Sequence, residues 1–228
     1  EERALVGGTL LGLAMFAVLF LGAVLVVFLT NGIVRGDAES GLLQPLVVRP
    51  MGRGATLVAR YLGAAAAGVA YVLVVYLAAV LAMRALGDWA PENVLGPGLS
   101  LALAVAVIAT LSVLASVQLA TTAQGIAVFM LFGAGLVGGL LGQLGEALSS
   151  RTLERIGEVV SMALPFEALY QYGLHLLTEG TSGLTEVVIR LGPFGGAEDR
   201  GAWLVIYALA YAALVLAVAV AAFRRRDL

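Results

Sequence analysis

The chain has no cysteine and no lysine, and its only histidine is His175. Without thiolates it cannot form a disulfide, a cysteine-ligated zinc or iron–sulfur centre, or a cysteine nucleophile. One imidazole without cysteines or clustered carboxylates does not make a typical metal site, so an interfacial or packing role is favoured for His175. All 13 basic residues are arginine and the formal net charge is −2. No basic run is long enough to indicate nucleic-acid binding.

Charged residues are also scarce. They make up 12% of the chain, against 61% hydrophobic residues, and the mean hydropathy is +1.01. A soluble domain is about half apolar and about one quarter charged, so this composition indicates an integral membrane protein. No nucleophile-elbow, zincin or P-loop spelling occurs, and we assign no catalytic residue.

Five apolar runs are long enough to cross a bilayer, whose core of about 30 Å requires about 20 helical residues. They cover residues 4–30, 57–83, 98–120, 125–144 and 202–223. The sequence therefore predicts an all-α polytopic bundle that forms a single transmembrane domain over residues 1–228. A short hinge over residues 121–124 is expected between the third and fourth runs.

The centres of these runs contain no acidic or basic residue and no histidine, which argues against an ion-coupled carrier. The polar side chains within them are mainly in the third run: Thr110, Ser112, Ser116 and Gln118. Serine and threonine hydroxyls usually bond back to their own helix, so we expect the same here.

Two polar segments separate the apolar runs. Residues 35–56 alternate charged and apolar positions, and the spacing predicts a short amphipathic helix from Asp37 to Val48 that ends before Pro50. Residues 145–201 contain no run long enough to span. We expect two or three amphipathic helices there: one over residues 152–164, one after Pro165, and a third over residues 184–191. Their apolar faces would lie on lipid or on the spans, and their acids would form a solvated face.

The distribution of arginine predicts the orientation. The tail and the loop over residues 31–60 together carry seven arginines and three acids, whereas residues 84–97 and 145–201 carry five arginines and ten acids. The positive-inside rule places the tail and the first loop in the cytoplasm. Five spans then place Glu1 outside. Because the chain begins with Glu1 rather than methionine, we expect that residues precede it. An odd number of spans with an external start predicts one further span upstream, six in total, with both ends in the cytoplasm.

Glycines mark one face of the fourth run. Gly133, Gly135 and Gly138 spell G-x-G-x-x-G, but no strand precedes them, so a dinucleotide site is not expected. Gly135 and Gly139, and likewise Gly138 and Gly142, are four residues apart, a spacing that lets two helix backbones approach closely. The partner helix could belong to the same chain or to a second copy across a symmetric homodimer seam.

Three stretches resemble a known family. Residues 39–53 (ESGLLQPLVVRPMGR) are similar to the segment after the second span of type 2 ABC transporter permeases. Residues 162–170 (MALPFEALY) resemble the proline-containing segment before the last span of that family, and residues 223–228 (FRRRDL) resemble its ending. The similarity is closest to the subgroup that includes the permease of nitrous-oxide-reductase maturation. The sequence departs from the family pattern at Gly41, Gly52 and Arg60.

The resemblance implies a six-span exporter subunit in a bacterial or archaeal cytoplasmic membrane, with its C-terminus in the cytoplasm. It implies pairing with a second permease subunit, either an identical copy or a close homologue, and with two separate ABC ATPase subunits. Those ATPases would bind ATP and Mg, and this chain would hold no cofactor. The segment over residues 35–56 would be the coupling helix. Its ATPase-contacting residues would be Asp37, Glu39, Leu42, Leu43, Pro45, Arg49, Pro50 and Arg53.

A second function remains open on sequence grounds. The chain could be a non-transporting scaffold or regulatory membrane protein that binds a soluble partner through residues 35–56. An intramembrane enzyme would require buried acids, bases or metal ligands, which the spans do not contain.

Overall fold

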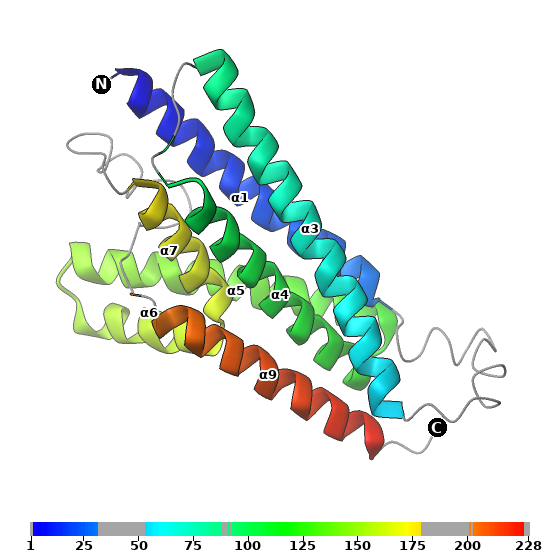
Figure 1. Ribbon diagram of the computed structural model, residues 1–228. Coiled ribbons are helices and arrows are strands. Elements are labelled where there is room, and N and C mark those ends of the chain that lie inside the picture. Colours follow the sequence, from blue (N-terminus) through cyan, green and yellow to red (C-terminus); the bar gives the residue numbers. More distant parts are fainter. Residues whose placement is uncertain are drawn as a thin grey trace.

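A computed structural model of the chain describes residues 2–31, 53–87, 91, 93–178, 201 and 203–225 (Figure 1). Within these residues it contains seven helices and no strand. The helices are α1 (Glu2–Thr30), α3 (Arg53–Gly87), α4 (Leu95–Gln118), α5 (Thr121–Ala147), α6 (Arg151–Ala163), α7 (Pro165–Thr178) and α9 (Trp203–Arg224). Five of them, α1, α3, α4, α5 and α9, are long and apolar enough to cross a membrane. The predicted helical membrane bundle is confirmed at this level, because each predicted run coincides with one of these five helices.

The break between α4 and α5 lies earlier than predicted. Leu119 has φ −110° and ψ 159°, and Ala120 has φ −68° and ψ 156°, so these two residues form the extended link. The backbone N–H of Gln124 donates to the carbonyl oxygen of Ala120 at 2.8 Å, which makes residues 121–124 the first turn of α5. The expected hinge over those residues is therefore wrong. The two preceding residues make the turn instead.

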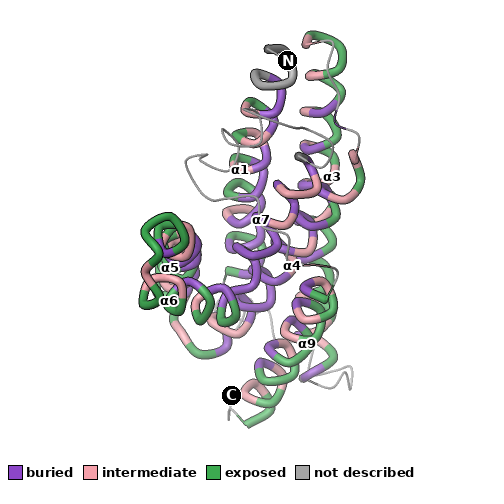
Figure 2. Tube along the Cα trace, turned by 90° about the vertical axis from the view of Figure 1, so that its left-hand side faces the viewer, coloured by how far each residue is buried: buried purple, intermediate pink, exposed green. Residues whose placement is uncertain are grey.

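Helix α4 occupies the centre of the bundle and packs against α1, α3, α5, α7 and α9. Its sequence is apolar on every side and carries no charge, the pattern expected of a helix surrounded by protein. Figure 2 shows the contrast with α3 and α9, whose outer surfaces are largely exposed. Val74 of α3, Met130 of α5 and Ile206 of α9 are 65%, 70% and 71% exposed. Apolar side chains on the outside of such a bundle suit a lipid environment.

Glycines allow α1 and α3 to approach each other and α4 closely. A Cβ at Gly22 of α1 would lie 2.9 Å from Val105 of α4 and 3.0 Å from Val72 of α3. A Cβ at Gly68 of α3 would meet Val26 of α1. Small residues at such crossings let helix backbones pack tightly in a membrane, where no hydrophobic driving force favours helix association.

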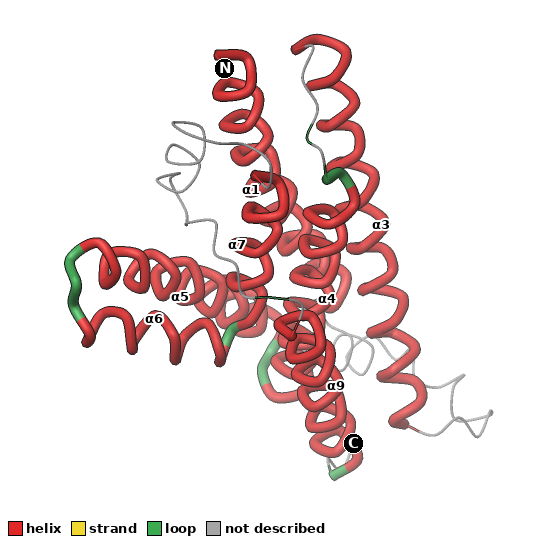
Figure 3. The backbone as a smooth tube through the Cα atoms, turned by 60° about the vertical axis from the view of Figure 1, so that its left-hand side comes forward, coloured by secondary structure: helices red, strands yellow, loops and turns green. Residues whose placement is uncertain are grey.

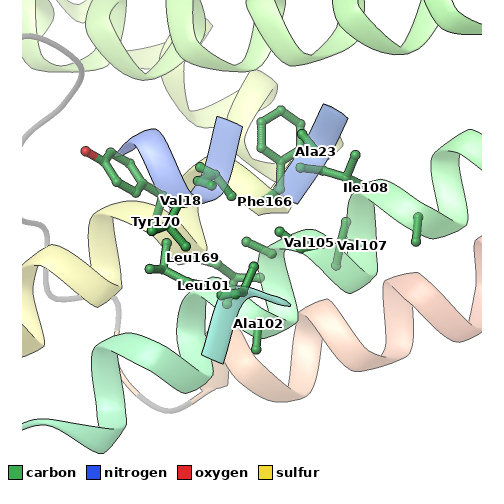
Figure 4. Packing of buried hydrophobic residues seen from close by; sticks show 14 of the residues in the cluster. Val18, Ala23, Leu101, Ala102, Val105, Val107, Ile108, Phe166, Leu169 and Tyr170 are labelled. Atoms are coloured by element: carbon green, nitrogen blue, oxygen red, sulfur yellow. The ribbon is translucent and has the colours of Figure 1, made fainter. Parts of the chain in front are cut away.

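The polar region after α5 forms two helices that differ in their surroundings. Helix α6 runs antiparallel to α5, and the two form a hairpin that projects away from α1 and α3 (Figure 3). Helix α7 returns into the bundle and packs mainly on α4. In Figure 4, Leu169 and Tyr170 of α7 lie beside Leu101 of α4 and Val18 of α1. The first two predicted amphipathic helices thus correspond to α6 and α7, and the third, over residues 184–191, lies outside the described residues.

Two tyrosines fasten α9 to the end of α6. The hydroxyl of Tyr207 donates to the carbonyl oxygen of Met162 at 2.6 Å, and the hydroxyl of Tyr211 donates to that of Ala163 at 2.7 Å. These carbonyls belong to the last turn of α6, where the helix itself supplies no partner for them. The side chains of α9 therefore complete the hydrogen bonding of α6.

Candidate functional site

Most of the predicted coupling segment lies outside the described residues. This applies to Asp37, Glu39, Leu42, Leu43, Pro45, Arg49 and Pro50, whereas Arg53 is described as the first residue of α3. The described residues stop at Asn31, after the end of α1, and resume at Arg53, the start of α3. These two points fix the end of the bundle at which the segment begins and finishes.

That end also carries the described arginines nearest the C-terminus. A Cβ at Gly54 would lie 3.0 Å from the side chains of Val220 and Arg224, so the start of α3 abuts the end of α9 (Figure 1). Arg224 and Arg225 line an open hollow of about 550 Å³ between these two helices. Leu29, near the end of α1, lines a second hollow of about 200 Å³ together with Arg60 of α3. The end of α9 and the end of α1 therefore each adjoin the early turns of α3, beside basic side chains.

A buried polar node ties three helices together at this end. The Nε2 amide of Gln124 in α5 lies 3.2 Å from the Ser112 Oγ of α4 and 3.2 Å from the carbonyl oxygen of Thr30 in α1. The hydroxyls of Thr30 and Ser112 are 2.6 Å apart. All three side chains are buried. As expected, Thr110 and Ser116 donate to the carbonyls of their own helix, but Ser112 takes part in contacts between helices.

The glycine face of α5 is covered by α6 and α7 of the same chain. Gly138 faces Val160, and the Cα of Gly157 packs against Gly142 so closely that a Cβ at Gly157 would lie 2.5 Å from the Gly142 Cα. A Cβ at Gly135 would lie 2.5 Å from the Phe166 ring. The structure thus places these predicted packing residues, with Gly139, in a contact within the chain.

Gly139 faces the polar side chains of α7. A Cβ at Gly139 would meet Glu167 and lie 2.9 Å from the Gln171 Nε2. Glu167 and Gln171 are 0% and 2% exposed, and the Gln171 Nε2 donates to the Glu167 Oε1. Burial raises the pKa of the adjacent Tyr170, and the charge of Glu167 raises it further. Glu167 is therefore a carboxyl group inside the helix bundle, and its expected place on a solvated face is wrong.

Comparison of the chain with models of protein families and with curated proteins finds no match. Among the described residues, no group of three or more histidine, cysteine, aspartate or glutamate side chains is arranged to hold a metal ion. His175 is partly buried on α7, two turns beyond Glu167.

The sequence indicates the burial of Glu167 only weakly. Glu167 and Gln171 are four residues apart in a helix that also contains Phe166, Leu169 and Tyr170, all of which are buried. A polar pair among so many apolar residues suits a helix covered on several sides, but it also suits an amphipathic helix at a membrane surface. The glycines of α5 are the other sequence feature that indicates this burial, because only a small residue on the facing helix leaves room for the Glu167 carboxyl and the Gln171 amide.

Proposed function

We propose that this chain is the membrane-spanning permease subunit of an ATP-driven ABC transporter of the type 2 permease class, acting as an exporter. Two separate ATPase subunits would bind ATP and Mg, and a second permease subunit would complete the complex in the cytoplasmic membrane of a bacterium or archaeon. The segment over residues 35–56 would be the coupling element on which the ATPases act. The substrate is not assigned.

The observation that carries this proposal is that the end of α1 and the end of α9 both adjoin the early turns of α3. The chain enters the coupling segment from the end of α1 and leaves it at the beginning of α3, and the end of α9 lies against that beginning. Arg60, Arg224 and Arg225 line hollows at this end. Basic residues at one end of a set of spans favour a cytoplasmic position for that end, which is where a soluble ATPase would dock.

The helices at this end can carry a displacement into the bundle. A push on the coupling segment would act on α3 directly and on α9 through the packing of Gly54 against Val220. The hydrogen bonds of Gln124 to Thr30 and Ser112 join the end of α1 to α4 and α5. ATP binding would then be coupled to a change in the spans, provided that the ATPases bind the coupling segment differently in the two states.

The test is a double variant of the whole chain, Glu39→Ala with Arg49→Ala, purified with its ATPase subunits. Removing an acid and a base from the coupling segment should abolish the stimulation of ATP hydrolysis by the membrane subunit and weaken co-purification of the ATPases. The matched control is the double variant Glu146→Ala with Arg84→Ala. It also removes one acid and one base, and both are exposed and lie outside the coupling segment. This control should retain both properties.

Equal ATPase stimulation by the coupling-segment variant and the wild-type protein would refute the assignment of the segment. Co-purification of a partner that has no nucleotide-hydrolysing activity, in place of an ATPase, would instead favour a scaffold or regulatory protein. Insertion into the membrane should be the same for both variants, because Glu39 and Arg49 fall between two candidate spans in the sequence, and Arg84 and Glu146 lie in the last turn of theirs.

A further inference from the structure

The hollow between α3 and α9 has one apolar part and one charged end. Its volume is about 550 Å³, and Arg224 and Arg225 line it where α9 ends. The rest of its described lining is apolar and comes from Val58 of α3 and from five side chains of α9: Ala213, Leu216, Ala217, Val220 and Ala221. The hollow lies on the exposed outer side of these two helices (Figure 2). An apolar channel that ends in two cations matches the division of a phospholipid into acyl chains and an anionic headgroup.

The height of the hollow corresponds to one leaflet of a bilayer. Along α9 its lining extends from Ala213 to Arg225, which is about 18 Å of helix. Half of the hydrocarbon core of a bilayer is about 15 Å thick. When α9 spans a membrane, the two arginines therefore lie at the level of the headgroups while the alanines lie among the acyl chains.

The guanidinium group of Arg224 reaches across the end of the hollow toward α3. A Cβ at Gly54 would lie 3.0 Å from the Arg224 Nε and 3.1 Å from its Nη2, so the missing side chain of Gly54 leaves room for this group. Arg225 is exposed beside it. Neither α3 nor α9 contains an acidic residue, and in the tail that follows Arg226 and Asp227 have opposite charges. The two guanidinium groups thus offer several N–H donors to a phosphate, a geometry in which arginine binds strongly.

A second copy of the chain fits this hollow less well than a lipid does. Ala213, Ala217 and Ala221 are four residues apart, a spacing that also allows two membrane helices to pack. Two copies with the same orientation in a membrane would be related by a two-fold axis along the membrane normal, so each would present Arg224 and Arg225 to the same residues of the other. These like charges would repel, whereas an anionic headgroup would neutralise them.

We infer that the hollow between α3 and α9 binds one anionic phospholipid from the leaflet at this end of the bundle. Arg224 and Arg225 hold its phosphate, and its acyl chains lie along Val58 and Ala217. Basic pockets between membrane helices bind the headgroups of anionic lipids in this way. The bound lipid joins the end of α9 to the beginning of α3. The inference requires that these helices span a membrane, and it does not depend on ATP coupling.

Native mass spectrometry of the whole chain, titrated with palmitoyl-oleoyl phosphatidylglycerol, tests the charged end. The first molecule should bind more tightly than phosphatidylcholine with the same chains, because the choline ammonium offsets the charge of the phosphate. Arg224→Gln with Arg225→Gln should weaken phosphatidylglycerol binding about thirtyfold, since each basic side chain contributes about fivefold. The matched control Arg84→Gln with Arg151→Gln removes two exposed arginines outside the hollow and should leave the affinity unchanged.

A second variant tests the apolar part and keeps both arginines. Ala217→Phe places a ring where the acyl chains would lie and should weaken phosphatidylglycerol binding about tenfold, the contribution of two buried methylene groups. Ala70→Phe makes the same change at an exposed position of α3 outside the hollow and should have no effect. Circular dichroism checks that each variant retains its helices.

Three results would overturn the lipid site. The first is equal affinity of the wild-type chain for the two phospholipids, which requires no variant. The second is an affinity that does not change in the Arg224 and Arg225 variant, or that falls equally in its control. The third is displacement of the lipid by another occupant: glycerol phosphate at equal concentration would indicate a site for a soluble anion, and a dimer that excludes the lipid would indicate a second copy.

Discussion

Replacing Gly157 with alanine tests the contact that holds the α5–α6 hairpin together. A Cβ at this position would lie 2.5 Å from the Gly142 Cα and 2.8 Å from the Gly142 backbone nitrogen. It would also lie 3.2 Å from the carbonyl oxygen of Gly138. All three atoms belong to the backbone, so no side chain can rotate away. Ordinary contact begins at 3.4 Å, so the helices must separate by about 0.9 Å at this point.

The expected cost follows from two opposing terms. Overpacking of this kind costs about 1–3 kcal/mol, and a backbone obstacle favours the upper part of that range. Alanine recovers up to about 1 kcal/mol because it is the better helix former. We therefore expect Gly157→Ala to lower the free energy of unfolding by about 1–2 kcal/mol.

The structure supplies two controls with the same chemical change. A Cβ at Gly142 would lie 3.5 Å from the Gly157 Cα, an ordinary contact, and one at Gly133 would meet nothing within 4 Å. Gly142→Ala and Gly133→Ala should be neutral or stabilising by up to about 1 kcal/mol. Unfolding by SDS in mixed micelles, followed by circular dichroism, ranks the three variants. If Gly157→Ala were as stable as Gly142→Ala, the described packing of α6 on α5 would be incorrect.

Two other features give predictions of their own. Gln124→Leu removes the amide that contacts Thr30 and Ser112. Interhelical hydrogen bonds in membranes average about 0.6 kcal/mol each, so we expect this variant to be less stable by about 1–2 kcal/mol. In SDS unfolding, Ser112→Ala should cost less in the Gln124→Leu background than alone, and strict additivity would contradict the shared node. Because the chain has no cysteine, single cysteines at Ser40 and Ala147 can be labelled with an impermeant maleimide in oriented vesicles. We expect Ser40→Cys to react only from the cytoplasmic side and Ala147→Cys only from the other, and reaction of both from one side would refute the orientation.

The five long helices could be predicted from the sequence because the thickness of a bilayer sets a minimum length for an apolar run. The spacing of Gly138 and Gly142 likewise predicted a close helix contact. The identity of the partner could not be predicted, since a four-residue repeat describes one helix and says nothing about which other helix meets it. The partner is α6, and its own Gly157 completes the contact.

The buried position of Glu167 could not be predicted from the sequence. Its helix is amphipathic enough for a membrane surface, and only the packing of Phe166 and Tyr170 on distant spans places it inside the bundle. Burial of this kind depends on contacts between residues far apart in the sequence. The coupling segment remains a prediction from residue pattern and resemblance, because it lies outside the described residues.

Tyr207 and Tyr211 limit how the C-terminal helix can move. Their hydroxyls are held by consecutive carbonyls, so a displacement of α9 along its own axis would break both hydrogen bonds at once. A rotation that pivots near these bonds could preserve them while it swings the opposite, arginine-bearing end through an arc. The two hydrogen bonds thus oppose movement of α9 along its own axis and allow it to tilt about the end that bears the tyrosines.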